Sequence, residues 1–566
     1  MTNKDIGKIL KNTAAMIDLT GGNPYRSRAM ANAARNIERA EETVVQLAEA
    51  GNLKSIRGIG DGLADQINEI IATGTFQARE DLIGAIPAGL MEILRIKGLG
   101  AKKVRTLWQK LGVTTIKELE EMATTGQLAT VDGFAEKTQA NVLANIQLLK
   151  KYVTRRRYAD LYRLIETVPD MLKALPAVSD AAFAGEIRRK METVGEVILV
   201  VASDDATVVG EALTPWLDAP ATHDASANAL SATVADGIPC RVLLVDTEAY
   251  GTALWEQTGN DNHVKAFMAQ HGSPASGATE NSIYEAAGLA FIPPELREGE
   301  GELEAAANKT LPALIIADEL NGTLHNHSTY SDGAHTLQQM ADRAYDMGLS
   351  YFGICDHSQS LVVAHGLAAE RVAEQQEEIG RLNAQYVTEK ERPFKIFSGI
   401  ESDILNDGAL DYTDDVLASF DFIVASVHTR LNMPEDEATA RVLKAVENPY
   451  TSILGHPTGR ILLVREGYSL DYDVILEACA RNNVAIELNA SPYRLDLDWR
   501  YIRKATQMGI LISINPDAHA MDGLHDMHWG TEVARKGWLT TDQCLNAMPL
   551  ADFETWLAAQ KAKRPA

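Results

Sequence analysis

The chain has 566 residues, of which 46% are hydrophobic, so it is long enough to fold into several domains. It has no signal peptide, no apolar run long enough to span a membrane and no C-x-x-C pair among its four cysteines, which together favour a reduced, cytoplasmic protein without a membrane anchor. The net charge of −25 is uneven, with +6 over residues 1–157 and −31 over the remainder. This asymmetry is typical of a polyanion-binding segment joined to a carboxylate-rich one.

Residues 3–148 show helical periodicity and two glycine-rich segments, 56–62 and 96–103, each with the pattern apolar-x-Gly-apolar-Gly before a helix. Glycine permits a tight turn, and the N–H groups at a helix N-terminus can bind a phosphate. The segments therefore predict helix–hairpin–helix motifs that hold a DNA backbone regardless of sequence, with plain helix packing as the alternative. A third segment, 131–137, lacks the second glycine and is a weaker match. The residues expected to contact DNA are Gly58, Gly60, Gly62, Gly98, Gly100, Lys102, Lys103 and Arg105.

Further along the chain, residues 158–317 have the character of a folded scaffold, with strands expected at 197–201 and 240–245. From residue 318 onward, short apolar runs alternate with helix-like stretches, and each run ends at a polar side chain. That alternation predicts seven parallel strands joined by helices and closed into a barrel. In such a barrel the site lies at the carboxyl ends of the strands.

The polar side chains at these strand ends include histidines and carboxylates suited to bind metal. His325 and His327, two residues apart on an extended segment, point the same way, and Asp332 follows after a short turn. One such histidine alone is more often an ordinary core or surface residue, but a full set favours a multi-metal site. Imidazole with carboxylate suits Zn²⁺, Mn²⁺ or Fe²⁺ equally. The set is His325, His327, Asp332, His357, Glu401, His428, His456, Asp517 and His519.

On this ligand pattern, residues 318–566 resemble a PHP (polymerase and histidinol phosphatase) domain, a metal-dependent phosphoesterase with a distorted (βα)7 barrel. The resemblance implies that the nine residues are catalytic and hold three divalent ions, whereas their spacing alone implies only a multi-metal site. The implied groups are His325, His327, Glu401 and Asp517 for one ion; Asp332, His357 and His519 for a second; and Glu401, His428 and His456 for a third.

The whole chain resembles the bacterial family X DNA polymerases that carry a C-terminal PHP domain. The segments 23–29 with 33–35 and 293–297 resemble the start of that family's lyase-like domain and the close of its thumb. The resemblance implies a multidomain α/β fold with a helical helix–hairpin–helix region and an α+β nucleotidyltransferase-like palm. The implied domains are 1–80 (lyase-like), 81–157 (fingers, with the second hairpin), 158–248 (palm), 249–317 (thumb and linker) and 318–566 (PHP barrel).

The chain departs from the family pattern where polymerase chemistry needs it most. The phosphate-binding serine is replaced by Glu186, and the three metal-holding aspartates by Glu196, Ile198 and Arg241. A two-metal site needs its carboxylates, so we expect polymerase activity to be lost. At the position of the family's Schiff-base lysine stands Gln66, which is no amine nucleophile.

The expected function is a DNA repair-type, metal-dependent phosphodiesterase: a 3′-5′ exonuclease that also cleans 3′ ends or cuts abasic sites, acting as a monomer on gapped or 3′-ended DNA. The alternatives are an active family X DNA polymerase with 3′-5′ exonuclease activity, a small-molecule phosphatase of the histidinol-phosphate type, and a DNA-binding scaffold with structural metals. Arg460 and Arg494 follow strand ends and are candidates for phosphate contact, or equally for structural salt bridges.

Overall fold

The computed structural model describes residues 1–38, 40, 42–96, 98–131 and 133–565. The chain forms two compact units, Met1–Val153 and Thr154–Ala566, which are described separately here. Lys97 and Asp132, which belong to the second and third glycine-rich segments, lie outside the described residues. Among the residues described, no helix is both long and apolar enough to cross a membrane.

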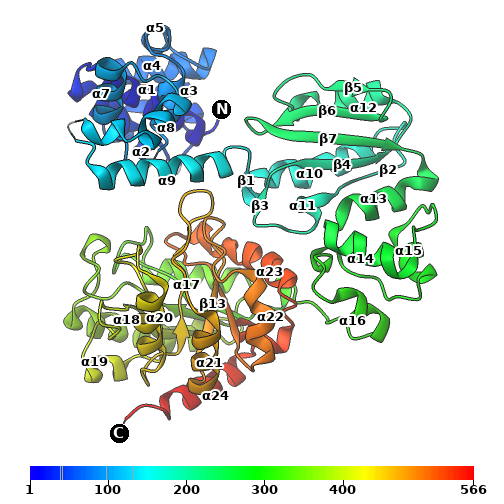
Figure 1. Cartoon of the computed structure of the whole chain (residues 1–566). Coiled ribbons are helices and arrows are strands. Elements are labelled where there is room, and N and C mark those ends of the chain that lie inside the picture. The colour runs from blue at the N-terminus through cyan, green and yellow to red at the C-terminus, as the bar shows by residue number, and fades with distance from the viewer. Residues whose placement is uncertain (39, 41, 97, 132, 566) are drawn as a thin grey trace. The chain divides into compact units, whose positions relative to one another are not determined.

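The first unit is helical, as expected (blue to cyan in Figure 1). It has two hydrophobic cores, one built from residues between Ile6 and Phe76 and the other mainly from residues between Ile86 and Ile146. Its longer helices present one apolar face to these cores, which is the pattern of a surface helix. The α-helices of this unit are α1 (Asn3–Thr20), α2 (Pro24–Glu38), α3 (Val44–Glu49), α4 (Asp61–Thr73), α5 (Gln77–Ala85), α6 (Gly89–Ile93), α7 (Ala101–Leu111), α8 (Ile116–Thr124) and α9 (Glu136–Tyr152).

The second unit begins with a mixed five-stranded sheet in the order β2-β4-β7-β6-β5. The strands expected from sequence are its central pair, β4 (Val197–Ala202) and β7 (Ile238–Val245), which run parallel. Their neighbours pair antiparallel: β2 (Asp180–Phe183), β6 (Ala229–Val234) and β5 (Thr222–Asp224). The accompanying helices are α10 (Tyr162–Lys173), α11 (Gly185–Arg188), α12 (Ala206–Leu213), α13 (Tyr250–Thr258), α14 (Asp261–His271), α15 (Glu280–Ala286) and α16 (Glu302–Asn308). A two-stranded sheet joins β1 (Arg156–Arg157) to β3 (Thr193–Val194).

The rest of the second unit is a barrel of seven parallel strands in the order β14-β13-β12-β11-β10-β9-β8, with helices around it (yellow-green to red in Figure 1). The strands are β8 (Gly322–Thr323), β9 (Tyr351–Ile354), β10 (Lys395–Asp403), β11 (Phe422–Ser426), β12 (Ile453–Leu454), β13 (Ala485–Asn489) and β14 (Ile512–Asn515). The helices are α17 (Leu337–Asp346), α18 (Ala369–Glu389), α19 (Asp414–Ser419), α20 (Glu435–Val446), α21 (Tyr472–Asn482), α22 (Trp499–Gln507), α23 (Met527–Lys536) and α24 (Leu550–Lys561). This arrangement confirms the predicted (βα)7 barrel.

The two end strands of the barrel meet just beyond β8. The backbone N–H of His327 donates to the Ala518 carbonyl over 2.8 Å, and Leu324 donates to the Asn515 side chain over 3.1 Å. A separate apolar cluster inside the barrel includes Phe422 and residues of helix α24, where Phe553 stacks on Tyr351 with ring centroids 4.5 Å apart. The packed interior leaves the carboxyl ends of the strands as the place where polar side chains gather.

Buried ion pairs join the barrel to the preceding part of the second unit. Glu298 lies 3.0 Å from Arg189 and also pairs with Lys536, which is fully buried on helix α23. Two more pairs, Lys190–Glu532 at 2.8 Å and Arg535–Glu295 at 2.8 Å, lie along the same junction. Because a buried charge that loses its partner is costly, these pairs hold the sheet region and the barrel together.

Candidate metal centre

Each predicted metal-binding side chain lies in or just after a barrel strand, near its carboxyl end. The strands are buried on both faces, so they are apolar except where a side chain must reach the centre. His325 and His327 follow β8, His357 follows β9, Glu401 lies in β10, His428 follows β11, His456 follows β12, and Asp517 and His519 follow β14.

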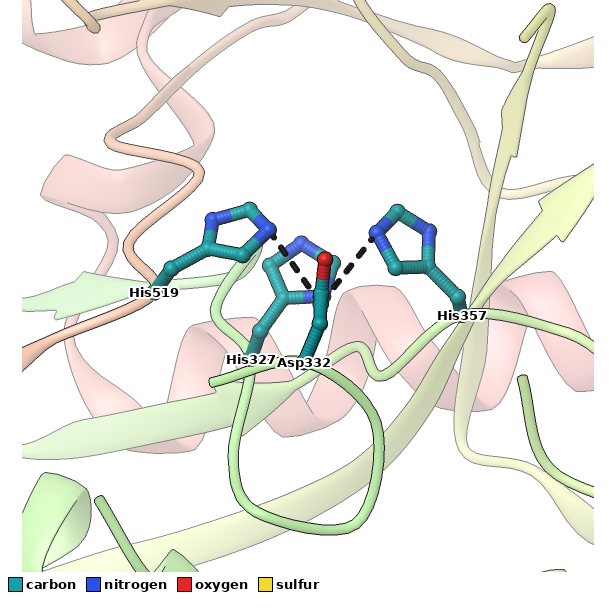
Figure 2. Close-up of side chains that lie close together, drawn as sticks. All are labelled: His327, Asp332, His357 and His519. Carbon is teal, nitrogen blue, oxygen red and sulfur yellow. Dashed lines mark ion pairs between the residues drawn. The ribbon is translucent and has the colours of Figure 1, made fainter. Parts of the chain in front are cut away.

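The structure brings these residues together in three overlapping groups whose ligand atoms lie within 4.8 Å of one another. In one group, shown in Figure 2, Asp332 lies among three imidazoles, with its Oδ1 3.4 Å from His519 Nε2 and 3.6 Å from His357 Nε2. The groups are His327 with Asp332, His357 and His519; His325 with His327 and Asp517; and His357 with Glu401 and His428.

Glu401 is the hub of the centre. Its carboxylate oxygens lie 2.7 Å from His357 Nδ1 and 2.9 Å from His456 Nε2. They also lie 3.1 Å from His428 Nε2 and 3.4 Å from His325 Nε2. The Glu401 side chain is completely buried, whereas Asp332 and His519 are 33% and 41% exposed, so a buried carboxylate faces four imidazoles in a centre that solvent can reach. All nine predicted residues therefore converge on one place.

The donor set fits divalent metal ions. Several buried ligand atoms have no hydrogen-bond partner among the described residues, including His325 Nε2 and Glu401 Oε2, and such atoms are costly unless something binds them. Burial, together with the neighbouring His519 and His357, lowers the pKa of His327 to about 3, so this imidazole is neutral, which is the form that binds metal. Nitrogen and carboxylate donors in this combination suit Zn²⁺, Mn²⁺ or Fe²⁺.

Glu487, which was not among the predicted site residues, contacts the side of the His325 ring that faces away from Glu401. Its Oε2 lies 2.6 Å from His325 Nδ1, which leaves His325 Nε2 to face Glu401. Its Oε1 accepts hydrogen bonds from the His456 backbone over 3.2 Å and from Asn489 over 3.0 Å. A carboxylate behind a metal-binding imidazole fixes its tautomer and orientation. A glutamate within the otherwise apolar run 484–488 was the available signal.

Two buried aspartates play comparable parts. Asp403 Oδ1 lies 3.4 Å from His428 Nδ1 and accepts from the His428 backbone over 3.2 Å. Asp356 accepts hydrogen bonds from Ser328 and Ser331, which fixes the turn that carries Asp332. Both aspartates thus position ligand candidates without belonging to the three groups.

We expect Glu487→Gln to weaken metal binding by about 10- to 100-fold, because the neutral amide no longer holds His325 in the ligating orientation. Titration against a competing chelator measures this affinity directly. Glu477→Gln, an exposed glutamate on helix α21, is the matched control and should leave the affinity unchanged. Equal metal affinity in both variants would contradict the orienting role.

The two arginines predicted to contact phosphate have different surroundings. The Arg494 Nε lies 3.6 Å from Asp517 Oδ2, at the edge of the metal centre. Arg460 instead takes the structural alternative: it pairs with Asp498 at 3.1 Å and Glu192 at 3.3 Å and donates to the Arg494 carbonyl over 3.0 Å. Only Arg494 is therefore placed to meet a phosphate at the centre.

In the first unit, three glycine-rich turns precede helices α4, α7 and α9 with the same backbone. Gly58, Gly98 and Gly133 have φ of +88°, +89° and +90°, a conformation that favours glycine. The residue two positions later does not need a positive φ. Gly60 is extended at φ −97°, and Ala135 holds the equivalent place at φ −54°. The third segment, expected to be a weaker match, therefore has the turn of the other two, because only the first glycine is required.

The other residues expected to contact DNA surround these turns. Gly62 and Lys102 are exposed, while Lys103 donates to the Gly98 carbonyl over 3.4 Å and lies 5.6 Å from the Phe134 ring centroid. Arg105 reaches the Asp18 carbonyl over 3.5 Å, so part of its role is structural. Gln66 is half-buried on helix α4.

The positions that depart from the polymerase pattern line a cavity of about 850 Å³ in the second unit. Glu186 pairs with Arg155 at 2.7 Å and accepts from the Gly195 backbone over 2.6 Å. Arg241 lies 3.3 Å from Glu196 and donates to Gln257 over 3.2 Å. Ile198 also lines the cavity. The charged side chains of the cavity wall named above are therefore paired with one another.

Comparison with known families and proteins agrees with this architecture. Residues 1–76 match the helix-hairpin-helix domain and residues 323–491 match the PHP domain. A "Probable phosphatase" from Thermoanaerobacter sp. (strain X514) is 26% identical over 250 residues, which cover 42% of this chain and 95% of that protein. A "Probable phosphatase" from Vibrio atlanticus (strain LGP32) is 28% identical over 215 residues, covering 36% and 79%.

One relative matches along the whole length. The "DNA polymerase/3'-5' exonuclease PolX" of Bacillus subtilis (strain 168) is 35% identical over 581 aligned positions, covering 98% of this chain and 99% of that protein. The match therefore includes the helical region, the mixed sheet and the barrel together. The chain belongs to the PolX family, the family X DNA polymerases with a C-terminal PHP domain.

Proposed function

We propose that this protein is a metal-dependent 3′-5′ DNA exonuclease whose chemistry resides in the barrel. The observation that carries the proposal is the convergence of four imidazoles on the buried carboxylate of Glu401. The name of the full-length relative from B. subtilis supports the same reaction. Digestion, 3′-end cleaning and cleavage at abasic sites all break a phosphodiester and need the same centre.

The nine predicted residues would hold up to three divalent ions, in the groups that the family resemblance implies. When bound, such ions polarise the scissile phosphate and lower the pKa of a bound water. The chain's own residues supply position: Glu487 and Asp403 fix two of the imidazoles, and Arg494 offers a guanidinium to the phosphate beside Asp517. The packed strands beneath the centre keep bulk water from the buried side.

We further propose that polymerase activity has been lost. Glu186 places a carboxylate where the family pattern has a phosphate-binding serine, and Arg241 places a guanidinium where it has an aspartate. In the structure this guanidinium forms an ion pair with Glu196, the carboxylate that a metal ion would need as a ligand. Ile198 offers no ligand atom. The same reasoning applies to the lyase reaction, because Gln66 has no amine to form a Schiff base.

A small-molecule phosphatase is the second candidate, favoured by the two probable phosphatases that match 42% and 36% of this chain. The paired hairpins of the first unit favour DNA instead, since they present helix N-termini behind tight turns suited to phosphate backbones. We propose that residues 1–80 and 81–157 bind DNA. Residues 158–248 and 249–317 form a palm and a thumb that serve as a scaffold. Residues 318–566 cleave the DNA strand.

An end-labelled primer–template tests both parts of this proposal. With Mn²⁺ present, we expect the labelled strand to shorten from its 3′ end, and added nucleotides to give no extension, because the palm lacks a metal-binding pair of carboxylates. Gel analysis of product lengths separates the outcomes. Template-dependent extension that Glu196→Ala abolishes would contradict the loss of polymerase activity. Hydrolysis of small phosphomonoesters without DNA cleavage would favour the phosphatase.

A further inference from the structure

An exposed tyrosine lies beside the metal centre and is not used by the chemistry described above. Tyr493 follows strand β13 in a turn fixed by a hydrogen bond from the Arg494 backbone to the Ser491 carbonyl, 2.8 Å. A second bond, from the Leu462 backbone to the Tyr493 carbonyl over 2.7 Å, ties this turn to the loop after β12. The backbone is therefore held in place, while 49% of the tyrosine surface is open to solvent.

One face of the Tyr493 ring is covered by a guanidinium from outside the barrel. The Arg157 side chain lies over the ring, with its Cζ 3.9 Å from the centroid. Asp160 holds that guanidinium through two hydrogen bonds, of 2.9 and 2.7 Å. Because 49% of the residue's surface stays exposed despite this cover, we expect the ring to have room for a second flat group.

Two arginines come from the two segments that a backbone hydrogen bond ties together, the turn that carries Tyr493 and the loop after β12. Arg494, the next residue, lies 3.6 Å from Asp517 and is only 23% exposed. Arg465, from the loop after β12, donates to the Gly459 carbonyl over 3.1 Å; burial and the neighbouring Arg494 charge both lower its pKa. Two guanidiniums near each other favour an anion between them, and bidentate binding to phosphate suits both.

We propose that Tyr493 is a stacking platform for a base at the 3′ end of an unpaired DNA strand, with Arg494 and Arg465 holding the adjoining phosphate at the metal centre. A flat open ring next to cations that face a phosphoesterase site is what single-stranded nucleic acid binds, since every base has a face to stack. The inference rests on the proposed exonuclease function and names its substrate as single-stranded or frayed 3′ ends. A base-paired end must first unpair before it can stack here.

Steady-state kinetics on a single-stranded oligonucleotide tests the platform. We expect Tyr493→Ala to raise KM by about tenfold or more with kcat little changed, because stacking of one base is lost while the centre is intact. Tyr493→Phe keeps the ring and should restore the KM. Val387→Ala, an exposed apolar residue on helix α18, is the control for a surface change. The kcat for bis(p-nitrophenyl) phosphate, which reports the metal centre at saturating substrate, should stay the same in all variants.

A binding measurement separates stacking from catalysis. The probe is an oligonucleotide with 2-aminopurine at its 3′ end and cleavage-resistant phosphorothioate linkages, added to the metal-loaded full-length protein. We expect fluorescence quenching with the wild type and Tyr493→Phe, and weaker quenching with Tyr493→Ala. An unchanged KM and unchanged quenching in Tyr493→Ala would overturn the platform. Quenching without any DNA cleavage by the wild type would instead overturn the exonuclease function and leave the platform standing.

Discussion

Glu401→Ala should lower nuclease turnover by at least about a thousandfold and release more than one equivalent of metal. The reason is its central position, where one carboxylate faces four imidazoles at 2.7 to 3.4 Å. An ion that stabilises transition-state charge contributes several kcal/mol, and each 1.36 kcal/mol is about a factor of ten in rate. Elemental analysis of wild type and variant, together with turnover on labelled DNA, measures both effects.

Two controls keep this result interpretable. Glu401→Gln preserves the side-chain volume and tests whether the loss comes from charge, and thermal unfolding of each variant shows whether the barrel has kept its fold. His223→Ala removes an exposed histidine of strand β5, far along the chain from the ligand candidates, and should change neither metal content nor turnover. Fewer than two tightly held ions in the wild type would contradict a multi-metal centre.

The convergence of the predicted ligand side chains could be foreseen from the sequence because its signal is local. In a barrel strand that is buried on both faces, a histidine or carboxylate at the carboxyl end interrupts an apolar run, as Glu401 and His456 do. Glu487 has the same kind of signal but lies within its strand, and its partner His325 comes from the opposite end of the barrel sequence. The closure of the barrel decides which imidazole Glu487 orients, and no local sequence pattern contains that information.

Arg460 shows what sequence position alone cannot decide. It follows a strand end, as a phosphate-binding arginine would, but its partners are Asp498 and the distant Glu192. The third glycine-rich segment shows that a departure from a sequence pattern can leave the backbone turn unchanged. Its missing glycine seemed to weaken the motif, yet Ala135 fits because that position has ordinary extended backbone, whereas Gly133 alone needs a positive φ.

Two arginines of the proposed palm, Arg188 and Arg189, form ion pairs that support its proposed role as a scaffold. Arg188 forms a salt bridge with Glu280, and Arg189 lies 3.0 Å from Glu298, which also pairs with the barrel residue Lys536. Side chains that precede the polymerase motif thus hold the sheet region, the following helices and the barrel together. A barrel cut free at residue 318 would lose Glu295 and Glu298 and expose the surface that they cover, so a truncation must keep the second unit whole.

Removal of the first unit, leaving residues 154–566, should raise KM on long DNA by about 10- to 100-fold and leave kcat nearly unchanged. Only binding shared by the ground state and the transition state is lost, and this appears in KM alone. Residues 1–153 hold 20 Lys+Arg and 17 Asp+Glu, a net charge of +3, whereas the remainder carries −28, so the full chain should bind DNA with a steeper salt dependence than the truncated protein. Kinetics between 50 and 200 mM salt, a range in which several phosphate contacts lose most of their affinity, measures both effects.

A full-length double variant, Gly58→Val with Gly98→Val, assigns the effect to the hairpins, because valine strains a backbone held at φ of +88° and +89°. We expect it to raise the KM for long DNA while bis(p-nitrophenyl) phosphate hydrolysis stays at the wild-type rate. Gly84→Ala, at a helical glycine of α5 with open space around it, is the matched control. If residues 154–566 degrade long DNA as well as the full chain at 150 mM salt, the first unit does not provide the DNA binding, and the second unit alone must hold the substrate.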